Sequence, residues 1–294
     1  MQYTWKKNLN QKVKLQTFLK ENGISGRTLK KIRHGEGEIL VNQTISKQSQ
    51  WISGDVEVTI ILKDEKADPT VNQSMLPIDI VCENDYFLAI NKAANLSSVP
   101  GPKDSQNTLA NRVLGYAQHQ LPSYVPHILT RLDYDTSGLV LFAKSNFIQS
   151  MLQQQISQHT MKKTYYALVS GKLEKEHALI DLPLEKESFE SARRVVRESG
   201  KPSQTEYWIQ ERYENATLVK VRLHTGRTHQ IRAHFAAIKH PLVGDELYGG
   251  TTTLIKRQML HAYQLELVNP FTNKLEKFTA EIPHDFKEVI QKLK

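Results

Sequence analysis

The chain has 294 residues, of which 39% are hydrophobic and 24% are charged, so it is long enough for one large domain and one small one. Its single cysteine, Cys82, excludes an internal disulfide and any metal site built from several cysteines, and we expect a cytoplasmic protein. No apolar run approaches the ~18 residues of a membrane helix, and the first residues lack the apolar core of a signal peptide. A formal charge of +8 suits a polyanionic partner, and nucleic acid comes before a membrane because no basic amphipathic anchor stands out.

Residues 1–62 are predicted to form a small basic unit. A first helix is indicated by three apolar residues on one face, Leu15, Phe18 and Leu19, and it ends at Gly23. Ser25 can cap a second helix. Strands are predicted at 38–42 and 56–60, with a turn at Gly54–Asp55 leading into the latter.

The second helix and the turn after it carry four cations, Arg27, Lys30, Lys31 and Arg33. By charge alone they form either a phosphate-binding surface or a solvated helix face. Two short helices followed by small strands resemble the αL RNA-binding module of ribosomal protein uS4 and of many RNA-modifying enzymes. The resemblance implies that residues 1–62 bind RNA mostly through phosphates, which position RNA but carry little sequence information. Residues 63–75 are polar and contain proline, so we expect a linker there.

The remaining residues, 76–294, are predicted to form the second domain. A strand at 86–92 ends in Lys92, a helix is indicated near 108–114, and a proline-bounded loop covers 121–126. The apolar run 139–143 follows Gly138 and is typical of a strand buried on both faces.

Asp133 lies in the turn before that buried strand, two residues after Arg131, which would stabilise its charged form. These residues alone allow two interpretations. Asp133 is either a catalytic carboxylate or one half of an ion pair that closes the turn.

The later elements bring further candidates. A helix is predicted at 145–158 and a strand at 161–169, in which Tyr165 and Tyr166 would face opposite sides of the sheet. A strand tyrosine is most often a packing residue. A basic hairpin is expected at 191–197, a helix that carries Arg232 should start near Thr228, and a final helix should lie near Pro283.

Three histidines recur at five-residue spacing, His224, His229 and His234. This spacing aligns them on neither a helix nor a strand, so we expect structural histidines and no metal.

Several motifs in this order are similar to those of the RluA family of RNA pseudouridine synthases. They are Asn91-Lys92, Arg131-Leu-Asp-Tyr-Asp-Thr-Ser-Gly138, Lys163-Thr-Tyr165-Tyr-Ala167 and Gln230-Ile-Arg232. The chain departs from the family at Thr130, where histidine is usual, and at residues 93–95, where proline and glycine are common.

The resemblance implies an isomerase that converts uridine in RNA to pseudouridine without a cofactor or a metal. Asp133 would be the catalytic carboxylate, Arg232 its ion-pair partner, and Tyr165 the ring that stacks on the target base. Four cations would contact the substrate, Arg131, Lys163, Arg227 and Lys92. The implied fold is α+β, with a mixed, mainly antiparallel sheet beside the small N-terminal module.

Large-subunit rRNA is the first substrate that we expect, tRNA is the second, and the protein should be a monomer. An alternative is a non-catalytic RNA-binding or ribosome-assembly factor that kept the fold. An aspartic protease is set aside, because the turn after Asp135 has one residue more than an Asp-Thr-Gly motif and has no second copy.

Overall fold

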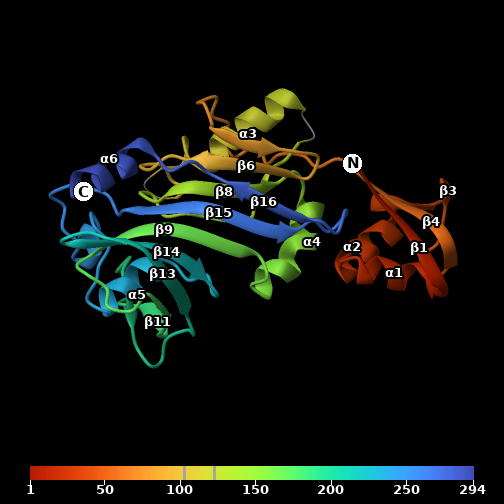
Figure 1. The fold of residues 1–294 in the computed structure, drawn as a ribbon. Coiled ribbons are helices and arrows are strands. Elements are labelled where there is room, and N and C mark those ends of the chain that lie inside the picture. Colours follow the sequence, from red (N-terminus) through yellow and green to blue (C-terminus); the bar gives the residue numbers. More distant parts are fainter. Residues whose placement is uncertain (102–103, 122–123) are drawn as a thin grey trace.

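The computed structural model describes residues 1–101, 104–121 and 124–294, and it contains a small N-terminal sheet and a large sheet of ten strands (Figure 1). The small sheet has the order β1 (Gln2–Lys14), β4 (Trp51–Leu62), β2 (Gly37–Val41) and β3 (Thr44–Ile45). The path of the large sheet is β10 (His177–Asp181), β13 (Gln204–Arg212), β14 (Ala216–Leu223), β9 (Lys162–Ser170), β15 (Leu260–Val268), β8 (Ser137–Ala143), β6 (Phe87–Lys92) and β5 (Ile80–Glu83). In addition, β16 (Leu275–Thr279) pairs with β15 and β7 (His127–Ile128) pairs with β8.

All neighbouring strands of the large sheet are antiparallel except β8 and β15, which are parallel. A separate hairpin consists of β11 (Leu184–Lys186) and β12 (Arg194–Val196). The helices are α1 (Leu15–Glu21), α2 (Gly26–Lys31), α3 (Leu109–Gln120), α4 (Asn146–Ser157), α5 (Gln230–Ala237) and α6 (His284–Leu293), with short helical turns η1 (Ile32–Glu36) and η2 (Glu246–Tyr248). The predicted α+β architecture with a mixed, mainly antiparallel sheet is confirmed. Among the described helices, none is long and apolar enough to cross a membrane.

The N-terminal sheet differs from the expectation in two places. Residues 2–14 form strand β1, which the sequence analysis did not predict, and β1 pairs along β4. The expected turn at Gly54–Asp55 is wrong, because β4 continues through both residues and Gly54 adopts a positive φ of 73° inside the strand. The helices of this unit are as expected, and the side chain of Ser25 accepts a hydrogen bond from the backbone N–H of Thr28.

Strand β8 lies inside the large sheet, and all seven of its residues are buried. The prediction of a strand covered on both faces is therefore confirmed. Gly138 makes the approach to its parallel neighbour possible, since a Cβ there would lie 2.3 Å from the carbonyl oxygen of Ala262 and φ is +110°. The start of β8, just after the Asp133 turn, is therefore held in place against β15.

The other helices match the sequence pattern closely. Thr108 caps α3 and Ser145 caps α4, each through its side-chain oxygen, and Pro283 precedes α6. Helix α5 begins at Gln230 rather than near Thr228, because His229 adopts the left-handed conformation. The basic segment 191–197 is the turn and second strand of the β11–β12 hairpin. The loop expected at 121–126 includes residues 122 and 123, which lie outside the described residues.

His261 of β15 provides a test of this packing through the pH dependence of stability. Its ring is fully buried, Nε2–H donates to the Ala280 carbonyl at 3.4 Å, and Nδ1 accepts from the Ser137 hydroxyl at 3.0 Å. Burial lowers the pKa of His261 from 6.5 to about 4. The folded state resists protonation, so the stabilisation is complete above pH 6.5 and is lost as the pH falls towards 4. Between pH 6.5 and 4 we expect the free energy of unfolding to fall by about 3 kcal/mol more in the wild type than in His261→Asn, which lacks the titrating ring. Urea unfolding of both proteins across this pH range measures the difference. Equal pH slopes for the two proteins would contradict this.

Candidate active site

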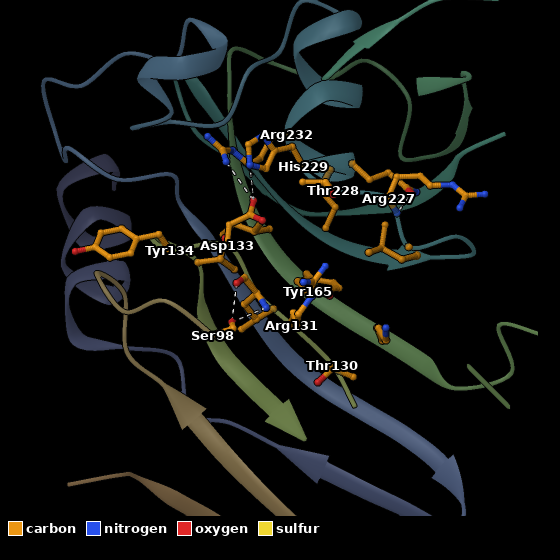
Figure 2. Close-up of a pocket in the computed structure, with 18 of the residues that line it drawn as sticks. Ser98, Thr130, Arg131, Asp133, Tyr134, Tyr165, Arg227, Thr228, His229 and Arg232 are labelled. Carbon is orange, nitrogen blue, oxygen red and sulfur yellow. Dashed lines mark hydrogen bonds and ion pairs between the residues drawn. The ribbon is translucent and has the colours of Figure 1, made fainter. Parts of the chain in front are cut away.

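A cavity of about 430 Å³ opens between the turn 129–136, strand β9 and the start of α5. Asp133, Tyr165 and Arg232 line it together (Figure 2), although they are far apart in the sequence, and Lys163 belongs to the lining as well. The structure thus brings the three predicted catalytic residues to one place.

Side chains from other parts of the chain hold the backbone of the Asp133 turn. The Ser98 hydroxyl donates to the Leu132 carbonyl at 2.7 Å and accepts the Leu132 N–H at 3.0 Å. The Lys92 ammonium donates to the Tyr134 carbonyl at 3.0 Å, and Arg257 donates to the Asp135 carbonyl at 3.4 Å. Because the backbone on both sides of Asp133 is fixed, the carboxylate has a defined position.

Arg232 is the cation that pairs with Asp133. Its Nη1 donates to Asp133 Oδ2 at 3.1 Å, while Nε and Nη2 grip the two oxygens of Asp245 at 2.7 and 2.9 Å. Burial opposes the charge of Arg232, but its bonds to Asp245 and the charges of Asp245 and Asp133 raise its pKa above the ordinary value. Asp245 is 1% exposed. The two-point grip of Asp245 on Nε and Nη2 therefore aims Nη1 at Asp133.

His229 is the second neighbour of the carboxylate, with Nε2 at 3.7 Å from Asp133 Oδ2 (Figure 2). Burial lowers the pKa of His229, so the ring is neutral at pH 7. The Tyr248 hydroxyl accepts the Arg194 N–H at 2.8 Å, and its one hydrogen can then go to His229 Nδ1 at 3.2 Å. This pattern leaves the ring proton on Nε2, which faces the cavity. The five-residue spacing predicts a structural histidine at this position, and the structure corrects this, because His229 lines the cavity.

Tyr165 of β9 forms part of the cavity wall, and the residue as a whole is 8% exposed. Burial and the nearby charge of Asp133 raise the pKa of Tyr165 well above its ordinary value, so the phenol keeps its proton. Tyr166 lies on the opposite side of the sheet, as expected, with its ring 4.8 Å from that of Tyr263. Lys163, two residues before Tyr165, also reaches the cavity, and burial lowers its pKa.

Of the three other cations predicted to contact the substrate, two line the cavity and one does not. Arg131 is exposed at the cavity and does not pair with Asp133, contrary to the expectation from their spacing. Arg227 lines the cavity, but its side chain points away from Asp133 (Figure 2) and donates to the Pro202 carbonyl at 3.3 Å. Lys92 is 1% exposed, does not line the cavity, and donates to three carbonyls, of Ala93, Leu96 and Tyr134. Burial lowers the pKa of Lys92 to about 7, and the nearby Asp133 and Asp135 partly oppose this. Its position favours support of the turn over contact with a substrate.

Four residues that support the site were not singled out for a role from the sequence, namely Asp245, Tyr248, Ser98 and Arg257. Their signal is weak, because each comes from a loop or a short turn and finds its partner only in the folded chain. His234 is fully buried and its Nε2 bonds the Leu182 carbonyl, while His224 bonds Glu206. These two histidines thus occupy structural positions outside the cavity.

Thr130, where the family usually has histidine, is 5% exposed at the edge of the cavity. Its hydroxyl oxygen accepts the N–H of Leu141 at 3.0 Å, a bond that holds the turn against β8. The four cations of the N-terminal module, Arg27, Lys30, Lys31 and Arg33, are all exposed on α2 and on the turn after it.

Comparison with known proteins identifies the family and the fold. A family model described as RNA pseudouridylate synthase matches residues 86–237. The chain belongs to this family. The RNA pseudouridine synthases similar to it include the uncharacterised YjbO of Bacillus subtilis, 33% identical over 92% of this chain and 96% of that protein. Another is ribosomal large subunit pseudouridine synthase D of Nitrosomonas europaea, 37% identical over 84% of this chain and 74% of that protein.

Solved pseudouridine synthase structures share the fold. Human RNA pseudouridylate synthase domain containing 4 superposes with a TM-score of 0.62 at 18% identity, over 73% of this chain and 92% of that one. Human RNA pseudouridylate synthase domain containing 1 gives 0.59 at 24% identity, over 71% and 85%. The family match over residues 86–237 and the relatives that are 33% and 37% identical show that the chain is an RNA pseudouridine synthase, an isomerase of the RluA family, as predicted.

Proposed function

We propose that this pseudouridine synthase isomerises specific uridines of large-subunit rRNA, with Asp133 as the catalytic carboxylate. The observation that carries the proposal is the ion pair of Asp133 with Arg232 inside the cavity, at 3.1 Å. A relative that is 37% identical bears the name of a large-subunit enzyme, which supports rRNA as the substrate.

The reaction breaks the bond between ribose carbon 1 and uracil nitrogen 1, turns the base, and joins ribose to carbon 5. A carboxylate suits this chemistry as a nucleophile if it stays ionised in a closed site. Arg232 stabilises the charged carboxylate and, held by Asp245, keeps it in one orientation. A proton leaves carbon 5 in the last step. Since Tyr165 keeps its own proton, water or another group is the better acceptor.

The target uridine must leave its stack, at a cost on the order of a few kcal/mol. Stacking on one aromatic ring returns about 1 to 3 kcal/mol per base. Tyr165 in the cavity wall can therefore offset most of that cost. Cations at the cavity, Arg131 and Lys163, would supply more through phosphate contacts.

Two substitutions at Tyr165 separate stacking from chemistry. We expect Tyr165→Phe to keep RNA affinity within about twofold, because the ring that stacks on the base remains, so any loss should fall on turnover alone. Tyr165→Ala should lose turnover and also weaken RNA binding by about 1 to 3 kcal/mol. Filter binding and single-turnover kinetics measure the two effects. Equal RNA affinity of the two variants would rule out stacking.

The substrate is tested by mapping pseudouridines in cells with and without this protein. Carbodiimide labelling and primer extension of separated rRNA and tRNA show which uridines lose their modification. Loss at one or a few positions of large-subunit rRNA, restored by the wild-type gene, is the expected result. Loss confined to tRNA would replace the rRNA assignment, and unchanged rRNA and tRNA would contradict both.

A further inference from the structure

The N-terminal module is joined to the catalytic domain by a cluster of aromatic rings. Tyr3 and Trp5 of β1 meet Phe271, which lies in the turn between β15 and β16, with ring centroids 5.3 Å away in both cases. The Tyr3 ring also lies 4.5 Å from Phe147 of α4. Tyr3 and Trp5 are 7% and 1% exposed, so this is a closed interface.

Polar contacts fix the same interface. The Tyr3 hydroxyl bonds that of Ser145 at 2.6 Å, and the Trp5 N–H donates to the Pro270 carbonyl at 3.4 Å. In the segment after the module, one oxygen of Glu65 bonds His127 at 2.6 Å and the other accepts the Asn146 N–H at 2.7 Å. The segment expected to be a linker thus makes specific contacts with the catalytic domain.

A second, smaller cavity lies between the active-site cavity and α4. The two cavities share three lining residues, Lys163, Leu223 and Gly226, and the smaller one is bounded by Ile156 of α4 and by His159 just after it. The loop after α1 contacts α4 as well, because a Cβ on Gly23 would lie 3.5 Å from Met151. The concave surface at Asp133 therefore leads to the helix on which the module sits, and Figure 1 shows α4 between the large sheet and the module.

Positive charges between the active-site cavity and α2 could bind the phosphates of one RNA strand. Among the described residues, no side chain bonds the ammonium of Lys163, which lines both cavities, so it is available for a phosphate. The exposed cations of α2 lie beyond α4. Phosphate contacts of this kind position an RNA without reading its bases.

We propose that the docked module and the active-site cavity form one rigid two-point RNA-binding surface. This surface selects uridines that lie at a set distance from a second RNA segment held by α2. The inference rests on the proposed function, since it assumes RNA on both parts. Two linked contacts raise affinity by about 10²- to 10⁴-fold when their spacing matches, and a loose connection loses part of this gain.

The first test measures rigidity without activity. Spin labels are placed on the exposed Cys82 of the catalytic domain and on a cysteine introduced by Thr44→Cys in the module, and their distance distribution is measured by pulsed electron resonance. A narrow distribution is expected in the otherwise unchanged protein, and a broad one after Glu65→Ala with Phe271→Ala. Leu275→Ala is the matched control, because this residue lies near the same turn but is 64% exposed. A broad distribution before these substitutions would overturn the proposal.

The second test compares two RNAs that contain the uridine mapped in the rRNA. One is the full large-subunit transcript, and the other is an oligonucleotide too short to reach α2. Glu65→Ala with Phe271→Ala should lower kcat/KM at least about tenfold on the transcript and leave the oligonucleotide unaffected within about twofold. Equal losses on both RNAs, or on neither, would overturn the two-point surface. Failure of the proposed function is distinct, since the wild type would then modify neither RNA.

Discussion

Asp133→Asn is expected to remove pseudouridine formation by at least about 10³-fold while RNA affinity stays within about threefold. The amide has the size of the carboxylate but cannot act as its nucleophile. Arg232 keeps both bonds to Asp245 in this variant, so the fold and the shape of the cavity should remain. Single-turnover kinetics and filter binding on the mapped rRNA fragment measure the two quantities.

Asp135→Asn is the matched control in the same turn. The carboxylate of Asp135 does not line the cavity, and burial raises its pKa while Arg232, Lys92 and Arg257 oppose this. A neutral amide should therefore be tolerated, with activity within about tenfold of the wild type. If Asp135→Asn were as inactive as Asp133→Asn, the turn as a whole would be responsible and the nucleophile assignment would lose its support.

Asp245→Asn should have the largest effect on stability. Arg232 and Asp245 form a bidentate pair in which Asp245 is 1% exposed, and Asp245→Asn leaves the buried Arg232 with only its single bond to the partly exposed Asp133. A loss of about 3 to 5 kcal/mol in the free energy of unfolding is expected, measured in urea. Turnover should fall as well, because Arg232 would no longer be aimed at Asp133.

The pair of Arg257 with Asp285 supplies the comparison. It has the same bidentate geometry, at 2.6 and 2.8 Å, but the side chain of Asp285 is 44% exposed. The Arg257 guanidinium that remains after Asp285→Asn is buried, but it keeps its bonds to the carbonyls of Asp135 and Gln258, and the Asp285 carboxylate was already partly solvated, so a smaller loss of about 1 to 3 kcal/mol is expected. Similar losses in the two variants would show that burial of the carboxylate does not decide how much these ion pairs contribute to the free energy of unfolding.

The elements near Asp133 could be predicted because local pattern and tertiary environment agree there. The run after Gly138 is apolar on both faces, and β8 is buried on both faces. Thr108 and Ser145 cap their helices within a few residues of chain, which a local pattern can show. The pairing of Arg232 with Asp133 came from the family resemblance, and the structure places the two side chains together.

Other features depend on contacts that no local pattern contains. Strand β1 is rich in lysine, asparagine and glutamine, and only Tyr3 and Trp5 of it are buried, so its alternation is too short to recognise. Lys92 was expected to contact the substrate, but its ammonium donates to three carbonyls in the interior, and no local pattern shows those partners. His229 and Asp245 reach the site only through the start of α5 and the turn η2.

Tritium release from RNA labelled at carbon 5 of uracil tests the central claim most directly. Isomerisation exchanges the hydrogen at that carbon with water, and cleavage or binding alone does not. Total RNA from cells that lack this protein is incubated with the purified wild type, with no cofactor or metal added. Release of tritium at the few uridines that are unmodified in those cells is the predicted result. Tight RNA binding without any release would contradict the isomerase and favour a factor that only binds RNA.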